Sequence, residues 1–341
     1  MRQFPKPDGL HDVGSITHRM ADATRPAHIL SDWPDRELFF KLWYPANASM
    51  EATASDRERL WDQLRGRPDV PLPVRWMLAT LKGVRSYTRP SAPYAHDVHS
   101  PRLVIYNHGL ISFASENTSL AEALASHGFV VLGIEHVEQF SEWQLLNRQK
   151  PAEKRNAATA ARLKTATPIE RAQIALDYYR SAKNANQVVE ARAADVTFAL
   201  QHIDSIVERI PGFGETKPNT DEVAVVGLSL GGAVATEFAA NNNRAAAIVN
   251  LDGGFFGSQQ GRSIAAPYLM MYSSESEGMN DALLPEQARS ITGPFTKHLN
   301  YHDIAIMMPF LRYAGVLGKA HASEFIQFRN HEVCRFLERG G

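Results

Sequence analysis

Residues 221–235 read DEVAVVGLSLGGAVA, and this stretch decides the fold. The apolar run 223–226 has the composition of a buried strand, and the alanine-rich residues after Gly232 have that of a helix. Between them, residues 227–231 match the pattern G-x-S-x-G. In a nucleophile elbow the turn is so sharp that glycine is needed two positions before and two positions after the serine. The stretch therefore predicts a strand, a tight turn with Ser229 at its apex, and a helix.

Composition narrows the classes of partner. The 341 residues carry 36 Lys and Arg against 37 Asp and Glu, a formal net charge of -1. Such a chain has no overall field that attracts nucleic acid or an anionic membrane. We expect a small-molecule substrate and no nucleic-acid partner. Nothing in the sequence indicates an oligomeric state.

The start of the chain does not resemble a signal peptide. The chain begins MRQFPKPDGLHDVG, without the apolar region of a signal peptide, and no run is long enough to span a membrane. These features predict a cytoplasmic chain, or a secreted one if a signal was removed before the numbering begins. They are also compatible with transient contact with a lipid surface. The single cysteine, Cys334, excludes an intrachain disulfide and is expected as a small core residue of a C-terminal helix.

Apolar runs alternate with helical segments along the chain. The runs expected as strands are 37–44, 102–107, 128–134, 223–226, 245–251 and 266–272. Continuous apolar strands separated by helices indicate a mostly parallel sheet with helices on both faces. We expect one α/β domain over residues 1–341, with helical insertions at about 51–90 and about 146–210. Helical spacing of apolar residues predicts that the second half of segment 168–210 packs on the core.

The carboxyl ends of parallel strands are where such folds place their chemistry. The turn His108-Gly109-Leu110 follows the strand at 102–107, and Leu230 follows the serine. Backbone N–H groups of Leu110 and Leu230 are therefore candidates for an oxyanion hole, which stabilises the tetrahedral intermediate of acyl transfer. Asp252 follows the strand at 245–251, where a hydrolase keeps the carboxylate that orients its histidine. An Asp-Gly pair also caps turns, so that simpler interpretation remains open.

Four histidines lie downstream of Asp252 and compete for the role of base. His331 stands inside the C-terminal helix and is interpreted as structural, and His302 shares a segment with His298. His321 stands just before that helix, where a generic hydrolase would place its base. Spacing alone leaves His298 and His321 open.

Short motifs in a fixed order then point to a known family. They are Trp43-Tyr44-Pro45-Ala46, His108-Gly109-Leu110, residues 124–131 (LASHGFVV), Glu135-His136, Arg192 with Asp195, the elbow, Leu251-Asp252-Gly253, and the pattern H-x-x-[FY]-x-D from His298 to Asp303. From about Gly14 to Leu337 the chain resembles the platelet-activating-factor acetylhydrolase family of serine esterases, in its bacterial form.

This resemblance implies the α/β-hydrolase fold and a cofactor-independent ester hydrolase. By motif, it implies Ser229 as nucleophile, Asp252 as orienter and His298 as base, with Leu110 and Leu230 as oxyanion donors. His321 becomes the second choice. The expected reaction passes through an acyl-enzyme and acts on short- to medium-chain or phospholipid-type esters.

The chain also departs from the family. Leu228 and Leu230 flank the serine where the family has histidine and a bulky, often aromatic, residue, and Gly253-Gly254 precede two phenylalanines where an aromatic residue is common. We therefore expect a different acyl pocket. The architecture is also similar to polyester-degrading and dienelactone hydrolases, and a non-catalytic binding protein on the same scaffold is the alternative from another functional class.

A metal site has little support. His298 and His302 are four residues apart and Asp303 is adjacent, so a zinc site can be drawn, but the chain has no H-E-x-x-H motif and no pair of thiolates. We expect no metal.

The helical segment at 51–90 contains residues 74–84 (VRWMLATLKGV), whose wide apolar face fits either a core-packed helix or a lid over a pocket. If it is a lid, shortening the side chains of Trp76 and Met77 should raise KM for long-chain esters with little loss of stability. A large fall in the melting temperature of the same variant would instead indicate a core helix.

Overall fold

The computed structural model describes residues 3–26, 36–47, 86–136, 162, 165–259 and 262–340. Within these residues one nine-stranded sheet has the order β3-β1-β2-β5-β4-β6-β7-β8-β9. Neighbours from β5 to β9 in that order are parallel, whereas β2 pairs antiparallel with β5 and β1 antiparallel with β2. The strands are β1 (Asp12–Asp22), β2 (Arg36–Ala46), β3 (Thr88–Pro90), β4 (Arg102–Asn107), β5 (Val130–Glu135), β6 (Asn219–Leu228), β7 (Ala245–Leu251), β8 (Tyr268–Ser273) and β9 (Arg289–Gly293).

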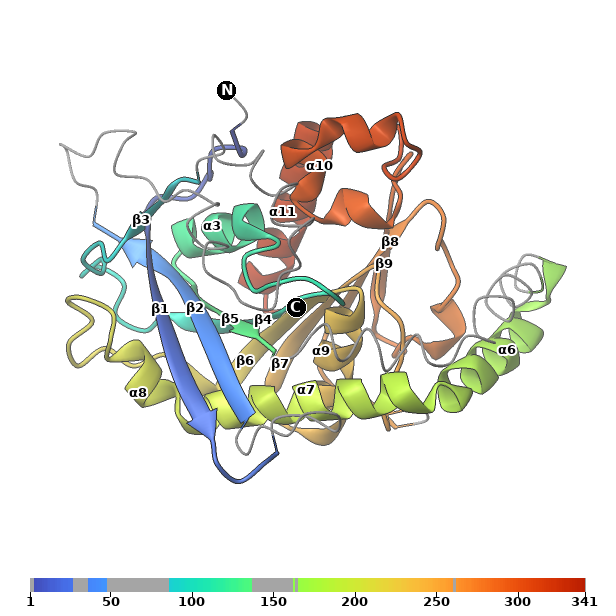
Figure 1. The fold of residues 1–341 in the computed structure, drawn as a ribbon, viewed down its shortest axis with the longest axis horizontal. Coiled ribbons are helices and arrows are strands. Elements are labelled where there is room, and N and C mark those ends of the chain that lie inside the picture. The colour runs from blue at the N-terminus through green and yellow to red at the C-terminus, as the bar shows by residue number, and fades with distance from the viewer. Residues whose placement is uncertain are drawn as a thin grey trace.

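Helices cover both faces of this sheet (Figure 1). On one face lie α3 (Thr118–Ser126) and α11 (Ala322–Glu338), and on the other lie α7 (Lys183–Gln201) and α9 (Leu230–Asn241). The other helices within the described residues are α6 (Pro168–Ser181), α8 (Ile203–Val207), α10 (Ile304–Met307) and the 3-10 turns η2 (Asp281–Leu283), η3 (His298–Tyr301) and η4 (Pro309–Arg312). No described helix is both long and apolar enough to cross a membrane.

Among the described residues the two largest apolar cores lie on opposite faces of the sheet, and β4 contributes to both. Leu103 and Ile105 pack in the core under α7 and α9, whereas Val104 and Tyr106 pack in the core under α3 and α11. Because successive side chains of a strand point to opposite faces, a strand buried on both faces must be apolar throughout. The fold class predicted from the continuous apolar runs, a mostly parallel α/β sheet, is confirmed.

Most predicted elements are found with small shifts at their ends. The strands at 102–107 and 245–251 have the predicted bounds, and the buried face predicted for the second half of 168–210 is confirmed by Val189, Val196 and Leu200. That segment is not one helix, since it is divided into α6, α7 and α8. Cys334 is buried on α11, as predicted for a core residue.

One boundary was wrong. The helical insertion predicted at about 51–90 is wrong for its last residues, because Thr88–Pro90 form strand β3, which pairs in parallel with β1. The N–H groups of Tyr87 and Thr88 donate to the buried carboxylate of Glu122, which fixes this short strand against α3. The proposed lid at 74–84 and residues 146–161 of the second insertion lie outside the described residues.

The junction of β6 and α9 is packed so closely that it depends on glycine. A Cβ built on Gly227 would lie 2.1 Å from the carbonyl carbon of Gly231. A Cβ built on Gly231 would lie 2.0 Å from the backbone oxygen of Asn107, at the end of β4. The first turn of α9 therefore rests directly on the ends of β6 and β4.

Gly231→Ala should consequently destabilise the protein by at least about 2 kcal/mol, since neither backbone can move away without disturbing the sheet. Urea denaturation followed by circular dichroism would measure it. Gly109→Ala is the matched control, because its Cβ would meet only ordinary contacts of 3.5 Å or more. Equal midpoints for the two variants would contradict the packing argument.

Candidate active site

Ser229 occupies the turn between β6 and α9 in a strained conformation. Its φ of 57° and ψ of -118° are rare for a residue with a side chain. Its N–H donates to the carbonyl oxygen of Leu251 at 2.9 Å, which ties the turn to the end of β7. Such strain concentrates at functional sites, and here it leaves the half-buried serine at the carboxyl edge of the sheet.

Asp252, directly after β7, is hydrogen-bonded to His298 at the start of η3. The distance from Asp252 Oδ2 to His298 Nδ1 is 2.7 Å. The other carboxylate oxygen accepts the N–H of Ser273 at 2.7 Å and the hydroxyl of Ser276. The Asp252 side chain is 2% exposed and that of His298 is 44% exposed. The carboxylate is thus fixed and buried, while the imidazole remains open to a reactant.

Asp252 and His298 each shift the pKa of the other. Burial lowers the pKa of His298, but the hydrogen bond and charge of Asp252, helped by the charges of Glu116 and Glu275, outweigh burial and raise it above its usual value. Burial raises the pKa of Asp252, but its interactions with His298 and with the N–H of Ser273 outweigh this and lower it. Asp252 therefore stays ionised and favours the imidazolium.

The structure places the competing histidines elsewhere. His321 precedes α11, is 66% exposed and lies 3.6 Å from Glu324. His331 is exposed on α11. Of the two candidates left open by spacing, His298 is the one next to Asp252. Among the described residues no hydrogen bond joins Ser229 to His298; such bonds often tighten only when substrate binds.

The turn 108–110 lies against the serine. A Cβ built on Gly109 would be 3.6 Å from the Cβ of Ser229. Leu230, the other predicted donor, opens α9 immediately after the serine. The two backbone segments predicted to bind an oxyanion are therefore neighbours of Ser229, at the start of a helix where the dipole favours negative charge.

The side chains of the leucines flanking the serine are buried in the apolar cores. Leu228 is buried in the core under α3 and α11, and Leu230 is buried in the core on the opposite face. The departures from the family at these positions are therefore changes of core packing beneath the serine. Phe255 is also in the core, while the partly buried Phe256 packs edge-on against Tyr179.

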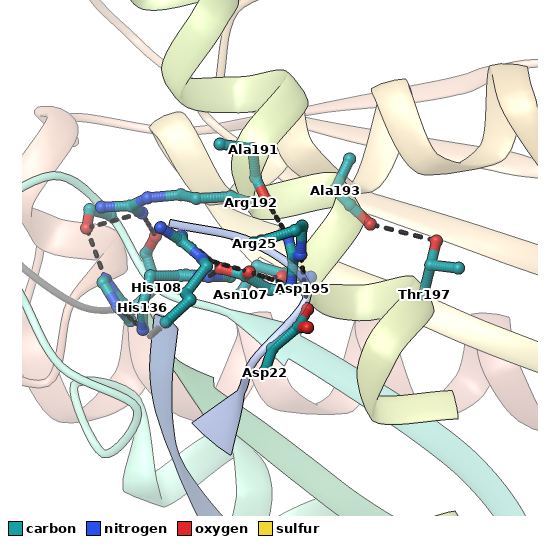
Figure 2. A network of polar contacts seen from close by, with 12 residues as sticks. Asp22, Arg25, Asn107, His108, His136, Ala191, Arg192, Ala193, Asp195 and Thr197 are labelled. Atoms are coloured by element: carbon teal, nitrogen blue, oxygen red, sulfur yellow. Dashed lines mark hydrogen bonds and ion pairs between the residues drawn. The ribbon is translucent and has the colours of Figure 1, made fainter. Parts of the chain in front are cut away.

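Behind the turn lies a buried polar network (Figure 2). Asp195 of α7 accepts from Arg36 at 2.5 and 2.6 Å and lies 2.8 Å from His136 Nδ1. Burial raises the pKa of Asp195, but the charge of Arg36 and the hydrogen bonds from His136 and Arg36 hold it well below its usual range. His136 Nε2 is 3.3 Å from the amide oxygen of Asn107, so the network reaches the end of β4.

The turn itself is bonded to this network. The N–H of His136 donates to His108 Nε2 at 3.2 Å, so the proton of this imidazole is on Nδ1, which donates to the oxygen of Gly109 at 2.6 Å. Arg192, one turn of α7 before Asp195, donates to the oxygen of His108 at 3.0 Å (Figure 2). The motif residues His136 and Arg192 thus contact the turn 108–110, and Asp195 is joined to it through His136.

The residues from which a zinc site could be drawn have other partners. His302 accepts the N–H of Ile304 on Nδ1, and burial, with the charge of Arg329, lowers its pKa to about 3. Asp303 accepts from Ser119 and pairs with Arg329. In the described part of the chain no three His, Cys, Asp or Glu side chains are arranged to hold a metal ion.

Comparisons with known proteins identify relatives of this chain. The chain is 23% identical to the platelet-activating factor acetylhydrolase of Bos taurus over 377 aligned positions, covering 99% of this chain and 77% of that protein. It is 23% identical to that of Canis lupus familiaris, covering 73% of this chain and 55% of the other. Its fold is similar to that of a ferulic acid esterase from Streptomyces cinnamoneus, with a TM-score of 0.68, 22% identity, and coverage of 99% and 92% of the two chains. The model of the family "Platelet-activating factor acetylhydrolase, isoform II" matches residues 1–341, so the chain belongs to that family.

Proposed function

We propose that this family member is a serine ester hydrolase in which Ser229, Asp252 and His298 form the catalytic triad. The observation that carries the proposal is the 2.7 Å hydrogen bond between Asp252 and a half-exposed His298 at the edge of the sheet where the strained Ser229 turn lies. The substrates proposed are short- to medium-chain or phospholipid-type esters, in keeping with the family.

The reaction follows from these groups. His298 takes the proton of the Ser229 hydroxyl as its oxygen attacks the ester carbonyl, and the N–H groups of Leu110 and Leu230 stabilise the oxyanion. Asp252 holds Nδ1–H of the imidazole, leaves Nε2 free to act as base, and stabilises the imidazolium. The imidazolium then protonates the departing alcohol. Water repeats the sequence on the acyl-enzyme, releases the acid and restores the serine.

The first test is hydrolysis of p-nitrophenyl esters from acetate to decanoate by the wild type and three variants. Ser229→Ala and His298→Ala should each lose at least about 10³-fold in kcat, because each removes a member of one catalytic unit. His321→Ala should retain wild-type kcat, since this side chain is remote from Asp252. The chain length with the highest kcat/KM would identify the acyl preference.

If His321→Ala hydrolyses no ester while His298→Ala remains active, His298 is not the base. If the wild type hydrolyses no ester and is not labelled by a fluorophosphonate, the scaffold is a binding protein. A matched p-nitroanilide distinguishes an esterase from an amidase.

The second test is the pH dependence of kcat/KM. Because only neutral His298 can accept the serine proton, and because Asp252 raises its pKa, activity should fall about tenfold per pH unit below an apparent pKa higher than the ordinary value of about 6.5. Asp252→Asn removes the charge that raises this pKa. It should lower kcat by about 10⁴-fold and move the acid limb to lower pH. A wild-type profile that stays flat down to pH 4, or an unmoved limb in Asp252→Asn, would contradict the assignment.

A further inference from the structure

Buried ionisable side chains hold the turn 108–110 from two sides. On one side Glu116 Oε1 accepts the N–H of Gly109 at 2.9 Å. On the other, Arg192 Nη1 donates to the oxygen of His108 at 3.0 Å and lies 3.5 Å from the oxygen of Gly109. The peptide group between His108 and Gly109 is therefore held at its N–H by Glu116 and at its oxygen by Arg192, and Arg192 also reaches the oxygen of the next peptide group, which carries the N–H of Leu110.

The residue after Leu110 shows that this conformation is strained. Ile111 has a φ of 54°, in the left-handed region that a β-branched residue rarely adopts. Its side chain is 53% exposed, so most of it lacks the core packing that would offset the strain. A residue in such a region costs about 1–3 kcal/mol and persists only where its surroundings impose the conformation. Here the contacts at 108–109 are in the right place to do so.

Glu116 is costly to bury, and besides the turn its carboxyl contacts Tyr106 and lies 3.7 Å from His302 Nε2. It is 1% exposed; Oε1 also accepts the hydroxyl of Tyr106 at 2.6 Å, while Oε2 is buried without a hydrogen bond. Burial raises the pKa of Glu116 to about 7, although its hydrogen bonds and the charge of Arg192 act to lower it. A Cβ built on Gly109 would be 3.5 Å from Oε2 and 3.6 Å from the Cβ of Ser229, so the carboxyl lies just behind the turn that faces the serine.

We propose that Glu116 and Arg192 are positioning residues that hold the strained turn so that the N–H of Leu110 stays directed at the oxyanion. The inference rests on the proposed function and deepens it. Neither side chain is assigned a contact with substrate. Both act on the oxyanion through the peptide groups next to Gly109, and that effect is exerted in the transition state, where the oxyanion exists. The charge of Glu116 also helps to raise the pKa of His298, so kcat is compared on the pH plateau above that pKa.

The test compares Glu116→Leu with Glu122→Leu. Glu122 is a close control, because it is equally buried, its pKa is likewise raised by burial to about 7, its Oε1 accepts backbone N–H groups at 2.5 and 2.7 Å, and its Oε2 is also unbonded. It binds the N–H groups of β3 and not those of the turn. Both variants should lose stability, and only Glu116→Leu should lose kcat.

The expected loss in Glu116→Leu is about 10²-fold in kcat with KM changed less than about threefold, the pattern of a misplaced oxyanion donor. Glu116→Gln keeps an acceptor for the N–H of Gly109 and should recover most of that kcat. Arg192→Met and Arg192→Lys are a second pair of variants, and they test the contact on the opposite side of the turn. This pair still tests the proposal if Glu116→Leu does not fold. Arg192→Met should lose kcat and Arg192→Lys should recover part of it.

A double-mutant cycle with Ile111→Gly adds a measurement that a purely structural role would not affect. Glycine adopts the positive φ without strain, so a turn containing it needs less support. The factor by which Glu116→Leu lowers kcat should be at least about fivefold smaller in the Ile111→Gly background than in the wild-type background. A coupling of this size is within the range measured for contacting residues.

The inference is overturned if Glu116→Leu and Glu122→Leu retain the same kcat, if the loss is only in KM, or if Ile111→Gly gives no coupling. In those cases wild-type activity and an inert Ser229→Ala still support the proposed function. A wild type that hydrolyses no ester would remove the proposed function and this inference together.

Discussion

The structure depends on direct backbone contact between the start of α9 and the ends of β6 and β4. Since a Cβ on Gly231 would be 2.0 Å from the oxygen of Asn107, the helix can begin only where its backbone touches the end of β4. That contact forces the preceding Ser229 to a φ of 57°. It also brings the serine to the place where the turn 108–110 leaves β4. One close contact between backbones thus positions both the nucleophile and the peptide groups proposed to stabilise its oxyanion.

The two aspartate–histidine pairs near this junction differ in a way that matches different tasks. His298, paired with Asp252, is 44% exposed, and a proposed base must be reached by substrate and must gain and lose a proton. His136, paired with Asp195, is fully buried, and both of its ring nitrogens face oxygen atoms. Removing one partner of a buried charged pair is strongly destabilising, so the second pair fixes α7 to the ends of β4 and β5. The first pair is suited to chemistry and the second to position.

Sequence patterns predict the centre of this fold better than its edges for a physical reason. The strands at 102–107 and 245–251 are buried on both faces and are therefore continuously apolar. β1 and β9 were missed because they lie near or at the edges, where many side chains are exposed and the apolar run is broken. The pairing of Asp252 with His298 joins positions 46 residues apart, which no local pattern encodes; only resemblance favoured it over His321. Glu116 was missed because a single glutamate after a glycine turn carries no periodic signal.

The leucines that flank the serine differ from Ile111 in burial. Leu228 and Leu230 differ from the family, but their side chains are buried in the cores on opposite faces of the sheet. Ile111 combines exposure with a strained backbone one residue after Leu110. A large apolar side chain is costly to leave in water and, at positive φ, costly in conformation, so stability alone would favour glycine there. Because neither cost serves stability, the strain at Ile111 is best accounted for by the contacts that Glu116 and Arg192 make with the turn before it.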